Sequence, residues 1–248
     1  MKNNIKNNHE FNPHEITWSQ EKASRIWDYL SSKKSYHEKN FARLVGEEII
    51  NLIKEHDISL RGNALDYGCG PGFFLEKLLE EDICCYGADF SKRSVDLANE
   101  KLKGNLLFKG VELINKFPIP FKDSTFDIVF LLEVFEHIPL EYLALTINEF
   151  KRITKKEGII VITTPNDENL EKGKVICPDC GCIYHAGQHI SAWTSNSLSN
   201  KMSDYNLKKV ICQAQTFRVK SILNVFRNIY AKIQKHKKMN LIYIGKNI

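Results

Sequence analysis

The sequence of 248 residues has no run of about 18 consecutive apolar residues, the length that a membrane span requires. Its first eleven residues are rich in Asn and Lys and form no apolar stretch, so we expect no secretory signal there. No internal repeat is present. These absences predict a cytoplasmic protein whose cysteine thiols stay reduced.

Acidic residues are absent after Asp204, whereas ten Lys and Arg residues lie between positions 208 and 248. The formal net charge is +5, so the first 207 residues are net −5 and the basic excess is C-terminal. Residues 219–238 combine this charge with an apolar stripe at helical spacing, which predicts a basic helix. It either contacts a phosphate-bearing substrate, a membrane surface or nucleic acid, or packs on the domain with a solvated face. Sparse aromatic residues make nucleic acid the least expected partner.

Hydrophobic periodicity and turn residues predict an α/β fold with a doubly wound parallel sheet. The expected strands are 63–67, 84–88, 106–109, 126–132, 159–163, 208–217 and 241–245. The expected helices are 19–31, 36–56, 73–79, 92–102 and 140–154. We divide the chain into an N-terminal helical cap (1–58), a core (59–166), a Cys/His-rich insertion (167–200) and closing strands around the basic helix (201–248).

A glycine-rich turn follows the first core strand. Gly68, Gly70 and Gly72 would let the backbone turn tightly and approach a ligand closely. Asp66 precedes the first glycine by two residues, and Asp89 ends the next strand, where an acid can bind two ribose hydroxyls. The pattern predicts a nucleoside-containing ligand at the carboxyl ends of these strands.

Residues 65–72 (LDYGCGPG) resemble the first motif of class I S-adenosyl-L-methionine (SAM)-dependent methyltransferases. Residues 87–91, 121–129 and 143–162 resemble later segments of the same superfamily, in the same order. This resemblance implies a Rossmann-like sheet of seven strands whose last two strands form an antiparallel hairpin. A nicotinamide-dependent dehydrogenase is the rival interpretation, but Phe73 stands where its fingerprint has a third glycine.

The resemblance also implies the residues that contact SAM. Asp66 and the glycines would face its methionine part, Asp89 its ribose, and Glu112 or a backbone group its adenine. The full predicted set is Asp66, Gly68, Cys69, Gly70, Asp89, Phe90, Glu112, Leu132 and Glu133.

The fourth core strand ends in the sequence E-x-x-E-H, which contains Glu133, Glu136 and His137. Two carboxylates and an imidazole beside the methyl donor could hold Mg2+ or another divalent ion, or Glu133 only anchors SAM or the fold. The segment resembles ubiquinone-biosynthesis O-methyltransferases and small-RNA 3′-terminal 2′-O-methyltransferases, which implies His189 as a further ligand. Without a metal ion, His137 or His189 is the predicted general base.

The insertion contains the spacing C-x2-C-x4-H-x3-H, formed by Cys177, Cys180, His185 and His189. This mixed Cys2His2 set suits tetrahedral zinc (Zn2+), and Cys182 could replace a histidine. The alternative is a loop of reduced thiols without a metal. Both metal hypotheses use His189, so they cannot both hold in full.

We therefore expect a SAM-dependent methyltransferase that acts on an oxygen of a small molecule or of a sugar- or lipid-linked acceptor. N-terminal residues Trp18, Trp27 and Tyr29 would cover the pocket. The alternatives are a metal-assisted 2′-O-methyltransferase acting on RNA 3′ ends, and a non-catalytic zinc-bearing binding module on a methyltransferase scaffold.

Overall fold

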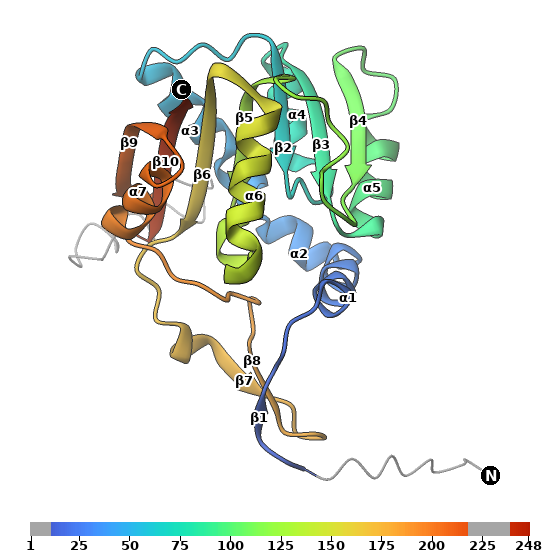
Figure 1. Ribbon diagram of the computed structural model, residues 1–248. Coiled ribbons are helices and arrows are strands. Elements are labelled where there is room, and N and C mark those ends of the chain that lie inside the picture. Colours follow the sequence, from blue (N-terminus) through green and yellow to red (C-terminus); the bar gives the residue numbers. More distant parts are fainter. Residues whose placement is uncertain (1–10, 218–238) are drawn as a thin grey trace, which may run out of the picture.

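A computed structural model describes residues 11–217 and 239–248, so the predicted basic helix at 219–238 lies outside the described residues. A seven-stranded sheet forms the centre of the molecule (Figure 1). In sheet order its strands are β4 (Phe108–Leu113), β3 (Cys84–Asp89), β2 (Asn63–Tyr67), β5 (Phe126–Leu132), β6 (Thr154–Pro165), β10 (Asn240–Asn247) and β9 (Leu207–Gln215).

Strand directions confirm the predicted α/β class. Strands β4, β3, β2, β5 and β6 are parallel, and β10 runs antiparallel to both β6 and β9. The chain moves outward from β2 to β4 and then continues from β5 in the opposite direction. The carboxyl ends of β2 and β5 therefore border the point where strand order reverses, which is where ligands bind in such sheets.

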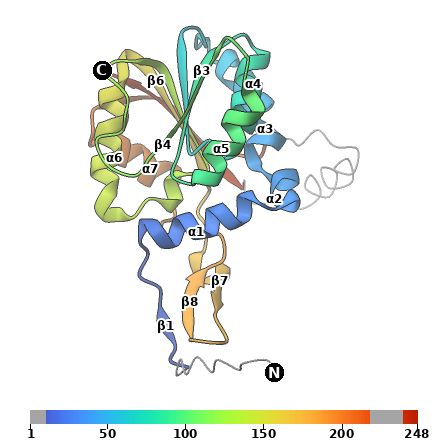
Figure 2. The same cartoon turned by 90° about the vertical axis from the view of Figure 1, so that its right-hand side faces the viewer.

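Helices cover both faces of the sheet (Figure 2). One face packs against α3 (Phe41–Glu55), α4 (Phe73–Glu80) and α5 (Lys92–Leu102). The other packs against α6 (Leu140–Ile153) and α7 (Ser195–Ser203). Burial on both faces explains why β5 is apolar along nearly its whole length rather than alternating between apolar and polar residues.

The structure differs from the prediction at several elements. The expected helix 36–56 is two helices, α2 (Lys34–Lys39) and α3, because Asn40 interrupts the helix and its side chain caps α3 at the Arg43 N–H. The third core strand begins at Phe108, later than predicted. Helix α7 was not predicted, because its sequence is mostly Ser and Asn and has a weak apolar pattern.

A second, three-stranded sheet projects from the carboxyl edge of the main sheet (Figure 1). Its strands are β1 (His14–Glu15), β7 (Lys174–Ile176) and β8 (Cys182–His185), and a 3-10 turn, η2 (Leu170–Gly173), leads into it. Strands β7 and β8 form a hairpin, to which β1 adds in parallel. We call this sheet, with its turn 177–181, the arm. Helix α1 (Gln20–Ser31) lies between the arm and the main sheet.

Within the ranges 11–217 and 239–248, no helix combines the length and the apolar character needed to span a bilayer. The cytoplasmic location stays a prediction.

Candidate active site

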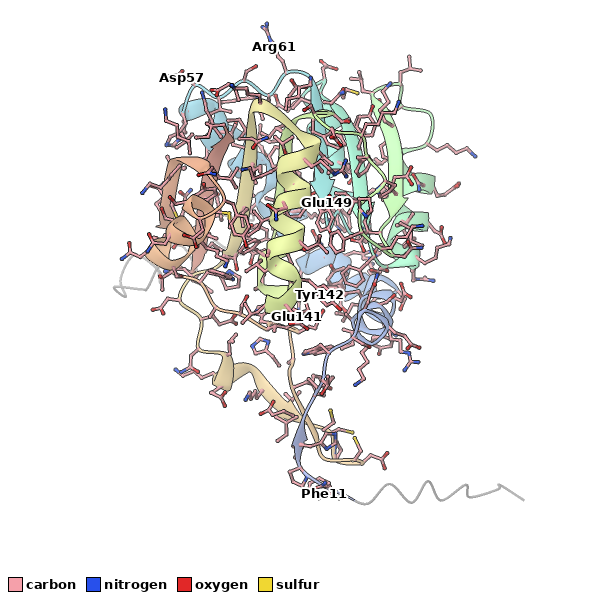
Figure 3. All side chains as sticks on the ribbon, in the orientation of Figure 1. Phe11, Asp57, Arg61, Glu141, Tyr142 and Glu149 are labelled. Atoms are coloured by element: carbon pink, nitrogen blue, oxygen red, sulfur yellow. The ribbon has the colours of Figure 1, made fainter. Side chains whose placement is uncertain are left out.

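A cavity of about 840 Å³ opens where the strand order reverses. Its size is in the upper part of the range of about 300–1,000 Å³ that small-molecule sites occupy. Glu141 and Tyr142 belong to its wall, and Figure 3 shows them at the edge of the main sheet nearer the arm, opposite Asp57 and Arg61. The predicted SAM residues that line the cavity are Asp66, Gly68, Cys69, Gly70, Asp89, Phe90, Leu132 and Glu133.

The glycine-rich turn is locked against the neighbouring strand. The main-chain N–H groups of Gly68 and Cys69 both donate to the carbonyl of Ala88, at 2.7 and 3.1 Å. Gly68 has a φ of +78°, and a Cβ there would lie 2.4 Å from Cγ2 of Val134. Conformation and space both require glycine at this position.

Two buried carboxyl groups lie at the carboxyl ends of β2 and β3. Asp89 accepts hydrogen bonds from the N–H groups of Gly70 and Ser91, each at 2.8 Å. Burial raises the pKa of Asp89 to about 6, while these hydrogen bonds oppose the shift. Burial and the charge of Asp89 raise the pKa of Asp66 to about 8. A cationic group in the cavity would favour ionisation of both carboxyl groups.

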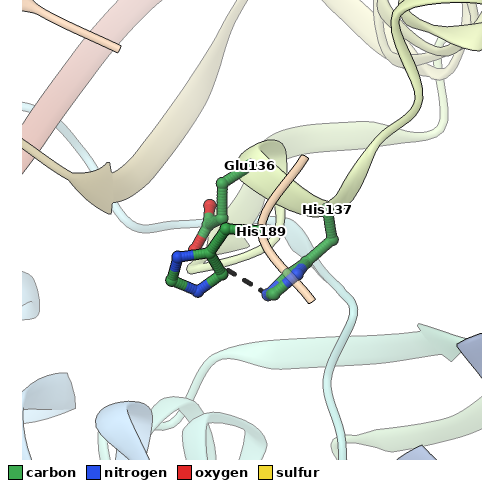
Figure 4. Close-up of side chains that lie close together, drawn as sticks. All are labelled: Glu136, His137 and His189. Atoms are coloured by element: carbon green, nitrogen blue, oxygen red, sulfur yellow. Dashed lines mark ion pairs between the residues drawn. The ribbon is translucent and has the colours of Figure 1, made fainter. Parts of the chain in front are cut away.

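A second polar group lies after β5, where η1 (Phe135–His137) forms one 3-10 turn. Glu136, His137 and His189 converge there, and a ligand atom from each lies within 4.8 Å of the others (Figure 4). Nε2 of His137 is 3.8 Å from Oε1 of Glu136. His189 comes from the loop after β8, so a segment distant in the chain completes this group.

Three carboxylate oxygens beside this group are buried. Among the described residues, both oxygens of Glu136 and Oε1 of Glu133 have no hydrogen-bond partner, although Glu136 is only 1% exposed. Burial and the charge of Glu133 raise the pKa of Glu136 well above its ordinary value. Burial likewise raises the pKa of Glu133 to about 7. Glu133 also has a φ of +55°, an uncommon conformation that often occurs at functional sites.

Both imidazoles have one nitrogen occupied and one left for a ligand. Nδ1 of His137 donates to the carbonyl of Gln188 at 3.1 Å, and burial lowers the pKa of His137 to about 4, so the ring is neutral. Nδ1 of His189 donates to Oε2 of Glu168 at 2.5 Å. In a neutral ring the Nε2 atom then keeps its lone pair. Such an outer partner on the second nitrogen is typical of metal-binding histidines, so these residues fit a divalent ion.

Residues 65–162 match the family model described as a methyltransferase domain. These residues are similar to those of class I SAM-dependent methyltransferases. This result confirms the resemblance drawn from the motifs and the seven-stranded Rossmann-like fold.

Individual relatives agree with this family. A ubiquinone biosynthesis O-methyltransferase of Pelagibacter ubique is 31% identical over 156 residues, which cover 59% of this chain and 63% of the relative. The chain thus spans less than two thirds of that relative's length. The methyltransferase in a complex with the Haloferax volcanii Trm112 activator has a TM-score of 0.67 at 15% identity, covering 89% of this chain and 97% of its own.

A further solved structure shows the same fold. It is geranyl diphosphate C-methyltransferase from Streptomyces coelicolor, solved with Mg2+, geranyl diphosphate and S-adenosyl-L-homocysteine. Its TM-score is 0.61 at 13% identity, over 95% of this chain and 100% of that one. At this identity the likeness concerns the fold alone.

The structure corrects the predicted adenine contact of the methyltransferase. Glu112 is exposed and does not line the cavity, because side chains alternate along β4 and its neighbour Val111 takes the buried side. Ile114, just after β4, lines the cavity instead, and its N–H donates to the carbonyl of Asp89.

Tyr36 is a cavity residue that the sequence analysis missed. A Cβ on Gly70 would lie 3.9 Å from the Tyr36 hydroxyl, and burial together with the charge of Asp89 raises the pKa of Tyr36 to about 12. The aromatic ring of Trp27 meets it edge-on at 6.1 Å. Trp18 and Trp27 line the cavity as predicted, whereas Tyr29 is 62% exposed and does not.

The predicted Cys2His2 zinc site does not form. Cys177 lies opposite Cys182 at the turn end of the hairpin. His185 lies opposite Lys174, three residues along the strand from Cys182. Three residues of a strand span about 10 Å, but ligands of one zinc ion lie within about 4 Å of each other. Among the described residues, the groups that could hold a metal ion include no cysteine, so Cys182 does not complete one either.

Proposed function

We propose that the protein is a SAM-dependent methyltransferase that methylates a hydroxyl oxygen of a small-molecule, sugar-linked or lipid-linked acceptor. We further propose that Glu136, His137 and His189, with Glu133 beside them, hold a divalent ion. One observation carries this proposal: the residues that suit SAM and those that suit an ion line the same cavity. The glycine-rich turn that suits SAM and the unpartnered carboxylate of Glu136 line the same cavity.

The cavity has two halves. One is formed by the glycine-rich turn with Asp66 and Asp89, the other by Glu136, His137 and His189, and each half has a distinct task. The Gly68 turn and Asp89 would orient the methionine and ribose parts of SAM. The buried carboxyl group of Asp66, when ionised, would balance the positive charge of SAM. Trp27, on α1, lines the cavity and would help to exclude water from it. Catalysis then depends mainly on aligning the acceptor oxygen, the methyl carbon and the sulfur in one line.

Methyl transfer forms a C–O bond, breaks the C–S bond of SAM and releases the acceptor proton. A divalent ion, when bound, lowers the pKa of a hydroxyl group. Glu136, His137 and His189 offer the oxygen and nitrogen donors that such an ion accepts. If no ion is bound, the neutral imidazole of His137 or His189 is the predicted acceptor of the proton.

Methylation of RNA ends is the less favoured activity. Among the described residues, the cavity wall contains Lys39 and Lys116 but no arginine, so these residues provide little positive charge for a phosphate backbone. The sequence similarity to ubiquinone biosynthesis O-methyltransferases instead supports a small acceptor with a hydroxyl group.

The test is transfer of labelled methyl groups from SAM to a panel of phenols, catechols and sugars. We expect turnover that falls by at least about 100-fold in EDTA and in the Glu136→Ala variant, and that Mn2+ restores only in the wild type. Glu141→Ala is the matched control, because Glu141 lines the same cavity but is exposed. Turnover unchanged by EDTA and by Glu136→Ala would remove the ion from the proposal.

A further inference from the structure

Three ionisable side chains meet where the arm joins the main sheet. Glu168 follows β6, His185 ends β8, and His189 lies in the loop beyond it. The two histidine rings stack at 4.6 Å with an angle of 21° between their planes. Glu168 faces both rings, with its oxygens 2.5 Å from Nδ1 of His189 and 3.7 Å from Nε2 of His185.

The hydrogen bonds of His185 show that this cluster is not a second metal site. Nδ1 of His185 accepts from the main-chain N–H groups of Gly187 and His189, each at 3.2 Å. In a neutral imidazole the proton must then lie on Nε2, so His185 has no lone pair left for an ion.

His185 is also held in place by close packing. A Cβ on Gly173 would lie 1.8 Å from Nε2 of His185, so the ring occupies the space that any side chain at position 173 would need. The Ala186 N–H donates to the Gly173 carbonyl at 2.8 Å. This contact fixes His185, and its Nε2–H faces Oε1 of Glu168.

The other carboxylate oxygen of Glu168 accepts a hydrogen bond from His189. Because Nδ1 of His189 donates to Oε2 of Glu168, the ring has a fixed orientation and its lone pair is on Nε2. Gln188, the preceding residue, does the same for His137 through its main-chain carbonyl. The loop that leaves the arm therefore orients both imidazoles of the metal-binding group.

We propose that Glu168 is a positioning residue that fixes the tautomer and orientation of His189 for ion binding, and that the ring of His185, stacked on His189, restrains it further. This inference rests on the proposed function, because it assumes that His189 binds an ion. It gives the insertion a chemical role that requires no metal ion at its cysteines.

The test measures Mn2+ affinity by titration calorimetry, with SAM affinity as a control for folding. We expect Glu168→Leu to weaken Mn2+ binding by about 10–100-fold, the usual effect of losing an outer partner of a ligand. Glu168→Gln keeps an acceptor oxygen for Nδ1–H and should recover most of that loss. Glu171→Leu removes an exposed acid of the same segment and should bind Mn2+ like the wild type.

The outcomes separate this inference from the proposed function. If His189→Ala abolishes Mn2+ binding while Glu168→Leu binds as tightly as the wild type, the positioning role is overturned and the ion site stands. If the wild type does not bind Mn2+, or if Glu136→Ala and His189→Ala bind it unchanged, the ion site itself is overturned.

A second measurement needs no variant of Glu168. Nitrogen NMR of the metal-free wild type reports which ring nitrogen of each histidine carries the proton. We expect the proton on Nδ1 of His189 and on Nε2 of His185. The reverse assignment for His189 would overturn the positioning role, whatever the affinity of the variants.

Discussion

The two halves of the cavity differ in how their buried polar groups are satisfied. In the half that suits SAM, Asp89 accepts two main-chain hydrogen bonds, and the N–H groups of Gly68 and Cys69 bond to Ala88. In the other half, both oxygens of Glu136 and one oxygen of Glu133 have no hydrogen-bond partner in the part of the chain that the structure describes. Unpaired buried carboxylates are costly, so the second half is built to be completed by something that binds there.

The largest expected effect concerns the incomplete half. His137→Ala should lower methyl transfer by about 100-fold or more and abolish Mn2+ binding, because it removes a ligand while leaving the glycine-rich turn intact. SAM affinity measured by calorimetry should change little. His37→Ala is the matched control, since His37 is also half-buried and bonded to a carbonyl, that of Ser31, but does not line the cavity. Equal losses in both variants would show that the effect comes from losing any half-buried imidazole rather than from the cavity.

The next effect concerns the half that suits SAM. Gly68→Ala should abolish SAM binding and lower the free energy of unfolding by about 1–3 kcal/mol, because it combines a strained backbone with a clash against Val134. Gly104→Ala is the control, since Gly104 has a φ of +90° with no atom within 4 Å of the added Cβ. It should cost only about 1–2 kcal/mol and leave SAM binding unchanged. Chemical denaturation and calorimetry measure both quantities.

Asp66 gives a pH-dependent test, because it is buried in the SAM half as Glu136 is in the other half. Burial raises its pKa from 3.8 to about 8. The folded state therefore binds more protons than the unfolded state between these pH values, and stability without SAM should fall as pH rises through them. Asp66→Asn removes this dependence. The variant should therefore be no more stable than the wild type near pH 4, and more stable by on the order of 1–3 kcal/mol above pH 8.

The measurement for Asp66 is chemical denaturation across this pH range, paired with SAM titration. We expect Asp66→Asn to weaken SAM binding even where it stabilises the free protein. A constant difference in stability between the variant and the wild type at all pH values would contradict the raised pKa.

The smallest expected effect is at Glu112. Because this side chain is exposed and outside the cavity, Glu112→Ala should change SAM affinity by less than about twofold, within the usual range of surface substitutions. A loss of tenfold or more, measured by calorimetry, would restore the adenine contact that the resemblance implies.

Features encoded by adjacent residues were predictable. The bounds 126–132 of β5 match the prediction because its apolar run begins and ends at clear polar and turn residues. The turn around Gly68 and the acids Asp66 and Asp89 could be located because each follows directly from the end of a strand.

Features that depend on distant pairings were not predictable. The spacing of Cys177, Cys180 and His185 is that of a zinc site, but the hairpin register separates the thiols from the imidazoles. Glu168 belongs to no motif, because its proximity to His189 arises only when the end of β6 and the loop after β8 come together. Glu112 lies outside the cavity, which was not predictable because the predicted strand ended at residue 109, whereas β4 continues to Leu113 and turns the side chain of Glu112 outward.

The contact between β1 and the arm has a consequence for the order of folding. The ion pair between Glu15 and Lys174 joins residues 159 positions apart, and β1 contributes only two residues to its sheet. Closing so long a loop costs entropy that two residues cannot offset, so β1 docks after the main sheet has brought its partners close. Since β1 leads directly into α1, which packs independently on α5, this late docking is expected to complete the cavity wall that carries Trp27.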